Sequence, residues 1–570
     1  MKKMFAIVIT ISCLGWFPWV SNAFAATGSD GTVKTREIFD SNGDKLFEDL
    51  AEKMAEAGPD ENLPVIAVFT DSGSGNRASL LRQLLGNFIL RHEYKNFPGM
   101  SLELNLAKIM ILASLDIVHH IEYDKPVTFA IDDAGYWFGA SPAKYDFGLA
   151  GNGTVVAIVD SGIDGSHVDL DEGKIIGWKD FVQWQPEPYD DNGHGTALAG
   201  IIAGDGDGNS DYTGIANGAK LVGVKVVPAT GLTLMSNVLI GIDWCISNKD
   251  AYGIDVINVS LGSVGMSDGS DIASLAVNRA VESGMVTVVA AGNEGPGEKT
   301  IGTPAAAEKA ITVGAMADVA EGGFFLGYFS GRGPTADGRI KPDIVAPGVY
   351  ITCCVANSVN QYESYSGTSL SAPFLSGVAA LILEANPALT PLQIKDILCE
   401  TAEDWGETGK DNDYGCGRLN AYRAIETAGG YSGTPIDTPV LLSASENLPG
   451  FGLEDIWEFT VDDTRYPIAI TLLENSTTCF LSAVINIFQY PSNIELTLID
   501  PDGQVVDKVN SITRQADLSY TPTKTGNYRI KVTSTLNSGL FVKINRNAEY
   551  SFDLSAGADQ GVGLILLQDQ

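Results

Sequence analysis

Short continuous apolar segments, separated by longer amphipathic ones, dominate the middle of the chain. Four of the apolar segments are rich in β-branched residues and are bounded by Gly or Asp: Val155–Val159, Leu221–Val227, Val256–Ser260 and Val286–Ala291. Helical patterns lie between and after them: Leu234–Asn248, Ile272–Ser283, Ser371–Ala385 and Pro391–Thr401. Strands that are apolar throughout and alternate with helices predict an α/β fold, in which a parallel sheet carries helices on both faces.

The two ends of the chain show other patterns. Ahead of the central region a small α+β unit is predicted from about residue 63, with elements at Val65–Phe69, Ala78–Leu90, Phe97–Leu104, Leu106–Leu115 and Val118–Tyr123. After the central region the strands are short, alternating and separated by turns such as Asp-Pro-Asp-Gly at 500–503. They are expected at Asp455–Val461, Ile468–Leu473, Ile494–Ile499, Tyr528–Val532 and Tyr550–Leu554. This pattern predicts an antiparallel β-sandwich.

Composition changes set the expected boundaries. Residues 1–25 have the features of a secretory signal, because Lys2 and Lys3 precede an apolar run that leads into Ala23-Phe24-Ala25, a small-x-small cleavage site. The later segments are 26–130 for the α+β unit, 131–428 for the α/β region, 429–439 for a Gly/Ser/Thr/Pro linker and 440–570 for the sandwich. The α/β region is expected to open with a loop-like stretch up to Gly153. A secreted protein, extracellular or in the cell envelope, is therefore expected, with no stable membrane span in its mature form.

The charge balance excludes some partners. The chain carries 36 Lys and Arg against 71 Asp and Glu, a formal net charge of −35. Nucleic acids and anionic membranes bind through basic patches that release counterions, so neither is an expected partner.

Six of the seven cysteines remain once Cys13 leaves with the signal. Six cysteines allow 15 pairings, so the sequence leaves the connectivity open. Cys399 and Cys416 flank a polar loop rich in Gly and Asp, and a bridge between them is the favoured single pairing. Cys245, on a predicted helix, is as readily a buried free thiol.

Three segments place one reactive side chain among small residues. Asp160 ends the first predicted parallel strand, at the edge of an α/β sheet where active sites form. His194 stands between two glycines before a stretch of small residues, and a histidine is the usual general base near neutral pH. Ser369 precedes an apolar helix, where its own backbone N–H is free to donate to an oxyanion. His167 lies in a loop near Asp169 and is interpreted as structural.

A fourth segment, Ala290-Ala-Gly-Asn293, places an amide after a parallel strand. With Asp160-Ser-Gly-Ile-Asp164, Asn192-Gly-His-Gly-Thr196 and Gly367-Thr-Ser-Leu-Ser-Ala-Pro373, in that order along the chain, it resembles the subtilisin-like serine proteases. The resemblance spans about Gly151 to Ala424, and no catalytic position departs from the pattern.

The resemblance implies a role for each residue. Ser369 would attack the scissile carbonyl, His194 would act as general base and then acid, and Asp160 would orient the imidazole. Asn293 and the Ser369 N–H would form the oxyanion hole. Five small or apolar residues would bind the substrate and line the first specificity pocket: Ser260, Leu261, Gly262, Ala291 and Gly292. Protein or peptide substrates are implied, with broad cleavage after larger apolar residues, and the chemistry needs no cofactor.

The α+β unit resembles the inhibitory propeptide of this family, which assists folding and then occupies the cleft. Leu112-Ala-Ser-Leu115 and Ile121–Val127 carry the likeness. The resemblance implies a self-processing zymogen that is cut between Asp124 and Ala140, with its own propeptide as an intramolecular inhibitor. A permanent N-terminal binding module is the alternative.

A structural calcium site is a further expectation. Asp205, Asp207, Asn209 and Asp211 alternate with small residues, as in calcium loops, although Ala216 stands where an EF-hand has its closing Glu. A solvated surface loop explains the pattern equally well.

The motifs also bear on three alternatives to a broad-specificity protease. An α/β-hydrolase needs Gly where the chain has Ser371 and uses the order Ser, Asp, His, so this alternative fails. A catalytically silent relative would be expected to have lost a triad residue, and none is lost. A narrow-specificity processing protease stays open, as does the role of the β-sandwich in substrate binding or stability, or its removal by trimming.

Overall fold

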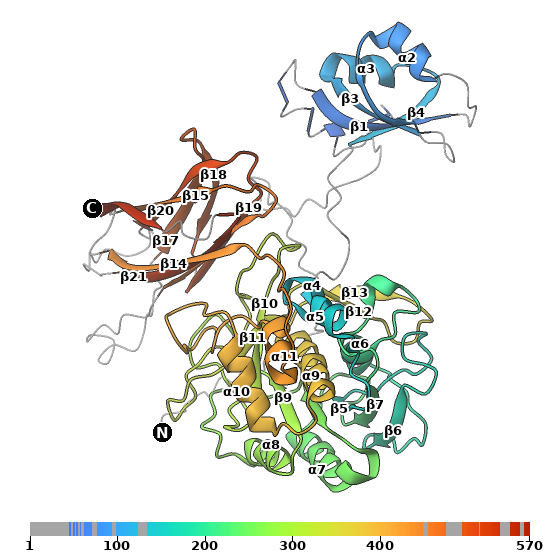
Figure 1. Cartoon of the computed structure of the whole chain (residues 1–570), viewed down its shortest axis with the longest axis vertical. Coiled ribbons are helices and arrows are strands. Elements are labelled where there is room, and N and C mark those ends of the chain that lie inside the picture. The colour runs from blue at the N-terminus through green and yellow to red at the C-terminus, as the bar shows by residue number, and fades with distance from the viewer. Residues whose placement is uncertain are drawn as a thin grey trace, which may run out of the picture. The chain divides into compact units, whose positions relative to one another are not determined.

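The chain divides into two compact units, Met1–Ala130 and Ile131–Gln570, each described here by itself (Figure 1). The computed structural model describes residues 45–46, 50–51, 53–54, 57–58, 62–70, 77–93, 99–123, 134–448, 454–474, 493–511, 514–535, 548–558 and 564–569. The predicted signal, residues 124–133 of the predicted processing segment, Cys13 and Cys479 lie outside these residues.

The first unit is the predicted α+β fold. Its antiparallel sheet has the order β2-β3-β1-β4, with β1 at Asn62–Phe69, β2 at Ile89–Glu93, β3 at Gly99–Asn105 and β4 at Val118–Tyr123. Helices α2 (Arg77–Leu85) and α3 (Leu106–Ala113) share the core of this sheet. The helix predicted over Ala78–Leu90 was too long. Gly86 adopts the left-handed conformation at φ +73°, which ends the helix, and the chain then enters β2.

The second unit is built on the predicted parallel sheet, which has seven strands in the order β11-β10-β9-β8-β5-β7-β6. The strands are β5 (Val155–Asp160), β6 (Ile175–Asp180), β7 (Lys220–Lys225), β8 (Val256–Val259), β9 (Val286–Ala290), β10 (Ile311–Met316) and β11 (Ile344–Pro347). The residues of β5, β8 and β10 are all buried, because helices cover both faces.

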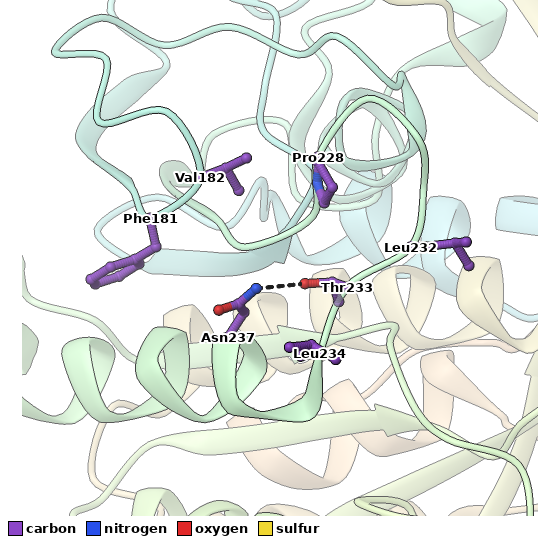
Figure 2. Close-up of a pocket in the computed structure, with 7 residues that line it drawn as sticks. All are labelled: Phe181, Val182, Pro228, Leu232, Thr233, Leu234 and Asn237. Atoms are coloured by element: carbon purple, nitrogen blue, oxygen red, sulfur yellow. Dashed lines mark hydrogen bonds between the residues drawn. The ribbon is translucent and has the colours of Figure 1, made fainter.

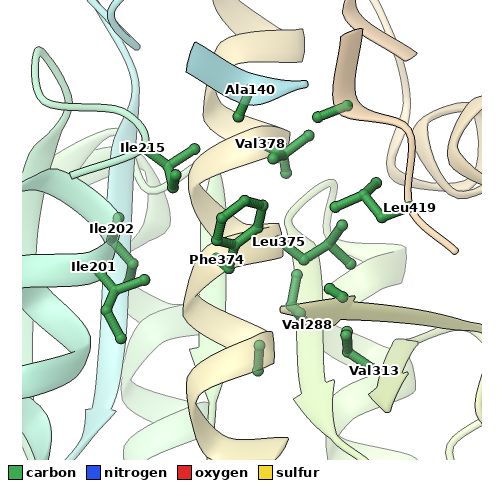
Figure 3. Packing of buried hydrophobic residues seen from close by; sticks show 14 of the residues in the cluster. Ala140, Ile201, Ile202, Ile215, Val288, Val313, Phe374, Leu375, Val378 and Leu419 are labelled. Atoms are coloured by element: carbon green, nitrogen blue, oxygen red, sulfur yellow. The ribbon is translucent and has the colours of Figure 1, made fainter. Parts of the chain in front are cut away.

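Helices α7 (Met235–Tyr252) and α8 (Ile272–Glu282) pack on one face of the sheet. The other face carries α6 (His194–Ala203), α9 (Thr368–Ala385), α10 (Pro391–Thr401) and α11 (Ala421–Gly429). Figure 3 shows Phe374, Leu375 and Val378 of α9 between Ile201 and Ile202 of α6 and the strand residues Val288 and Val313. Among the described residues α9 alone is long and apolar enough to cross a membrane, and here it is a core helix with most of its residues buried.

The loop-like stretch predicted up to Gly153 is corrected. It contains two short helices, α4 (Ala134–Trp137) and α5 (Ala140–Phe147). Ala140 and Ala143 are buried in the core beneath α11, which stabilises α5 although eight residues are too few for a helical repeat to show in the sequence. A hairpin of β12 (Ile351–Cys354) and β13 (Tyr362–Tyr365) was also not anticipated.

The predicted bridge between Cys399 and Cys416 is confirmed, and it closes a loop with a sequence separation of 17. It joins the end of α10 to the polar loop before α11. Cys245, Cys353 and Cys354 are buried.

The C-terminal strands form two antiparallel sheets around one core, as predicted for a sandwich. One sheet has the order β14-β21-β16-β19 and the other β18-β17-β20-β15-β22. The strands are β14 (Val440–Leu448), β15 (Glu454–Val461), β16 (Ile468–Glu474), β17 (Asn493–Ile499), β18 (Val505–Asn510), β19 (Gln515–Tyr520), β20 (Gly526–Thr535), β21 (Ala548–Ala556) and β22 (Ile565–Asp569).

A buried polar cluster joins β19 to the α/β region. Arg332, fully buried, donates from Nη1 to Asp413 Oδ1 at 3.0 Å and from Nη2 to Gln515 Oε1 at 2.7 Å. The Gln515 amide donates in turn to the Leu326 carbonyl at 2.7 Å, and Arg514 binds both oxygens of Asp413. Every member has a partner, so the sandwich is part of the same packed unit.

We expect Gln515→Leu to destabilise this unit by about 1–3 kcal/mol, because the buried Arg332 Nη2 keeps only its 3.2 Å bond to the Gly327 carbonyl and the Leu326 carbonyl loses the Gln515 amide. The matched control is Ser519→Ala on the same strand, which removes an exposed 2.6 Å hydrogen bond to the Gly322 carbonyl and is expected to change stability by no more than about 0.5 kcal/mol. Urea denaturation measures the stability of both variants. Equal losses of stability would show that the buried cluster stabilises the unit no more than the exposed hydrogen bond does.

Candidate active site

Asp160 is the last residue of β5 and lies at the carboxyl edge of the sheet. The side chain is 1% exposed, and its Oδ1 accepts hydrogen bonds from the Ser161 N–H at 2.7 Å and from His194 Nδ1 at 2.8 Å. Its other oxygen, Oδ2, is buried and has no hydrogen-bond partner among the described residues. Asp160 therefore directs one oxygen at the imidazole and holds it in place.

His194 is the first residue of α6, and its position follows from how that helix begins. Asp190 Oδ1 accepts the Gly193 N–H at 2.9 Å, and Ser161 Oγ accepts the Gly195 N–H at 2.8 Å. A Cβ on Gly195 would lie 2.2 Å from the Gly162 carbonyl oxygen, so only glycine fits. The helix start is thus held against the loop after β5.

The electrostatics of His194 favour its charged form. Burial alone would lower its pKa, but the charge of Asp160, the hydrogen bond to Asp160 and the charge of Asp190 together raise the pKa above its usual value. Nδ1 bears the proton donated to Asp160, which leaves Nε2 as the basic nitrogen of the neutral ring. The imidazole is 20% exposed, so solvent or a ligand can reach it.

Asn293 follows β9, and its amide orientation is set by the start of α9. Its Oδ1 accepts hydrogen bonds from the Thr368 N–H at 3.0 Å and from Thr368 Oγ1 at 2.9 Å. The amide nitrogen therefore points elsewhere, toward Gly367, where a Cβ would lie 3.4 Å from Asn293 Nδ2 and 3.0 Å from Ser369 Oγ. The Asn293 amide and Ser369 thus border the same small space.

Ser369 is the second residue of α9, which begins one turn earlier than the sequence indicated. Its carbonyl accepts a hydrogen bond from Ser260 Oγ at 2.9 Å. In the part of the chain that the structure describes, Ser369 Oγ makes no hydrogen bond to His194. Such a bond is often long or absent without substrate.

The five predicted binding residues follow two adjacent strands, β8 and β9. Ser260 is buried, and Leu261 packs on the core beneath α7. Gly292 has φ +102° and donates its N–H to Thr368 Oγ1 at 3.2 Å. A Cβ on Gly262 would lie 3.1 Å from the Thr303 carbonyl oxygen. Of the five, Ser260 and Gly292 thus make direct contact with the start of α9, at Ser369 and Thr368.

An apolar pocket of about 300 Å³ lies beside the His194 loop and was not predicted (Figure 2). It is lined by Phe181, Val182, Pro228, Leu232, Thr233, Leu234 and Asn237. A 3.3 Å hydrogen bond from Asn192 to the Ala229 carbonyl links its wall to the histidine motif. Its two leucines, Leu232 and Leu234, are 80% and 71% exposed, so their apolar surface is accessible to a ligand. The only sequence signal was their position in a turn-rich loop after β7.

The predicted calcium loop is arranged for other contacts. Asp205 is paired with Lys174 at 2.5 Å, and Asn209 caps a short 3₁₀ helix (Ser210–Tyr212) by accepting the Asp211 N–H. Asp207 and Asp211 are exposed. The Lys174 ammonium therefore already neutralises the Asp205 carboxylate.

Comparisons with known proteins show which family the chain resembles. The sequence model of the subtilase family matches residues 151–417, and that of the Tk-SP N-propeptide domain matches residues 41–108. Serine protease AprX of Bacillus subtilis (strain 168) is 42% identical over 302 residues, 49% of this chain and 67% of its own. Alkaline elastase YaB of Bacillus sp. (strain YaB) is 35% identical over 63% of this chain and 88% of its own. Among solved structures, sphericase is 30% identical over 49% of this chain and 96% of its own, with a TM-score of 0.43.

We expect the His194 imidazole to titrate above 6.5, its ordinary value, because Asp160 and Asp190 stabilise the imidazolium. Asp160→Asn should lower this pKa, since the Asp160 carboxylate raises it more than the Asp190 carboxylate does. NMR of ¹³C-labelled histidine measures both values, and with five histidines in the chain His194→Gln assigns the signal. A pKa that is unchanged in Asp160→Asn would contradict the pairing.

Proposed function

Because the chain belongs to the subtilase family of serine endopeptidases, we propose that Ser369 is its nucleophile, His194 its general base and Asp160 the carboxylate that orients the base. The observation that carries this assignment is the 2.8 Å contact between His194 Nδ1 and Asp160 Oδ1 at the carboxyl end of β5. It leaves Nε2 free to take the Ser369 proton as Oγ attacks the scissile carbonyl. The resulting imidazolium then protonates the leaving amine.

We infer that the oxyanion is held by the Asn293 amide and the Ser369 backbone N–H. Thr368 holds the amide oxygen of Asn293, so the nitrogen is oriented before substrate arrives. The Ser369 N–H lies in the first turn of α9, where it lacks an intrahelical partner. Donors that are already in place stabilise the tetrahedral intermediate without reorganisation.

The propeptide domain makes the chain a zymogen. We propose that the enzyme removes this domain itself, by cleavage between Asp124 and Ala140, and that the released domain inhibits the cleft. Support comes from the propeptide match at 41–108 and from the separate core of the first unit. A domain with its own core can stay folded after the cut, as an inhibitor must.

Apolar specificity is proposed from the surfaces near Ser369. Ala291, Gly292 and Gly262 are small, and the pocket beside the histidine motif is lined mainly by apolar side chains. Extended substrates with larger apolar residues would bury part of Leu232 and Leu234, which gains free energy in proportion to the apolar area covered.

We propose that the enzyme is secreted. The support is the apolar N-terminal segment with its small-x-small ending, together with the Cys399–Cys416 disulfide, which persists in oxidising compartments. Subtilases often bind structural calcium, and the loop at 205–211 is the proposed location here. Calcium would have to displace Lys174 from Asp205.

The central test compares the full chain with Ser369→Ala by intact mass and by casein hydrolysis. We expect cleavage between residues 124 and 140 and casein digestion in the wild type alone, because only it has the nucleophile. If both folded proteins behave identically, the triad assignment is wrong. Added trypsin then distinguishes a zymogen that awaits another protease from a binding protein.

We expect Asn293→Ala to lower kcat by about 10²–10³-fold with little change in KM, the loss known for the corresponding donor of a subtilisin. Asn248→Ala, which removes a 2.8 Å amide hydrogen bond to the Trp244 carbonyl within α7, is the matched control and should keep kcat within a few fold. Equal kcat for Asn293→Ala and the wild type, with the fold intact, would rule out the oxyanion role.

A peptide library separates broad from narrow specificity. The mature wild type should cleave after larger apolar residues, since no carboxylate lies among the predicted pocket residues. A strict preference for basic residues would instead identify a processing protease and overturn this part of the proposal.

A further inference from the structure

Three side chains with metal-binding atoms are buried together outside the catalytic site. His167 and Asp169 come from the loop after β5, and Cys354 ends β12. Their ligand atoms all lie within 4.8 Å of one another, and none of the three residues is more than 2% exposed. In the described part of the chain, no other group of three or more His, Cys, Asp or Glu residues meets this spacing. We propose that His167, Asp169 and Cys354 bind a divalent cation of borderline softness, with Zn²⁺ as the fitting ion.

Asp169 is a buried carboxylate whose negative charge a bound cation would neutralise. Its Oδ1 accepts the Gly208 N–H at 2.8 Å, and its Oδ2 accepts the Tyr362 hydroxyl at 2.8 Å. Both donors are neutral, and no lysine or arginine of the described residues forms an ion pair with Asp169. Burying a carboxylate is unfavourable unless a positive charge compensates it, and a metal ion would do so.

His167 has the hydrogen bonds of a ligating histidine. Its Nε2 lies 3.1 Å from the Gln361 carbonyl oxygen. A carbonyl only accepts, so Nε2 carries the proton and Nδ1 keeps its lone pair. Histidines that bind metal commonly donate their other ring N–H to a backbone carbonyl in this way. Nδ1 is occupied only by a long 3.2 Å contact with the Asp169 N–H, which a metal can displace.

The donor set selects the ion. One sulfur, one imidazole nitrogen and one carboxylate oxygen suit Zn²⁺ and not Ca²⁺ or Mg²⁺, which take oxygen ligands. Zinc–ligand distances of about 2.0–2.3 Å in a tetrahedron place the ligands about 3.3–3.8 Å apart. Cys354 Sγ donates a 3.7 Å hydrogen bond to Asp169 Oδ2, and the metal would replace this proton, which is released to solvent. The ligand atoms, which now lie within 4.8 Å of one another, would then have to close by about 1 Å. Water or the Tyr362 hydroxyl would complete the coordination.

The site joins three segments that hold α6 in place. A Cβ on Gly200 would lie 2.6 Å from Cys354 Sγ, so β12 packs directly on α6. The Gly208 N–H ties the loop after α6 to Asp169. A metal ion here would therefore stabilise the packing of the helix that begins with His194, without touching the catalytic residues.

The test uses the full chain with Ser369→Ala, so its outcome does not depend on the proposed activity. Co²⁺ is the probe, because a cobalt–thiolate bond gives a near-ultraviolet charge-transfer band that Zn²⁺ should abolish. We expect one equivalent to produce the band in this parent and in Cys353→Ser. The band should be lost in Cys354→Ser. Cys353 is the matched control, an adjacent buried thiol that contacts the Glu363 carbonyl on the other strand.

The proposal is overturned if the folded parent shows no thiolate band, or if Cys354→Ser retains it. Circular dichroism verifies that each variant is folded. His167→Gln is the second variant, in which we expect the visible bands of tetrahedral Co²⁺ to weaken and the apparent affinity to fall at least tenfold. Zn²⁺ should also raise the thermal midpoint of the parent and not that of Cys354→Ser. Equal midpoints with and without Zn²⁺ in the parent would show a cluster held by hydrogen bonds alone.

Discussion

The active-site edge depends on one close contact between backbones. Gly195, in the first turn of α6, lies against the carbonyl of Gly162 in the loop after β5, and no side chain would fit between them. This contact lets Ser161 and Asp190 cap the amides at the helix start. It also places the imidazole of His194 within 2.8 Å of Asp160. A larger residue at position 195 would clash with the Gly162 carbonyl and move His194 away from Asp160.

A second helix start supplies the other half of the site. Thr368 fixes the amide of Asn293, and α9 then runs through the core between α6 and the strands. The burial of α9 is what keeps Ser369 stationary, since its apolar side chains are packed on nearly all sides. The reactive groups thus stand on rigid elements, and the exposed loop at 228–234 provides the apolar surface beside them.

The C-terminal sandwich is hydrogen-bonded to the segment that contacts the backbone beside Asn293. Gly331 donates its N–H to the Gly292 carbonyl, next to Asn293, and the neighbouring Arg332 is held by Gln515 of β19. The half-buried Asp517 accepts hydrogen bonds from the Gln515 amide, and desolvation raises its pKa to about 6. The sandwich is therefore linked through Arg332 to the segment that bonds the backbone beside Asn293, which gives it a structural role in the α/β unit.

The sequence by itself determined the α/β class and the flanking α+β and sandwich units, and its motifs singled out the residues proposed for catalysis. Apolar strand patterns and glycine-flanked motifs are local, so they can be read without coordinates. The differences from the structure are local as well: α2 ends at Leu85 because Gly86 turns left-handed, and α5 has too few residues to show a clear helical period. Only the tertiary structure decided which distant groups meet. Tyr362 reaches Asp169, Cys354 joins His167, and Gln515 holds Arg332, because long-range packing rather than any local pattern brings such side chains together.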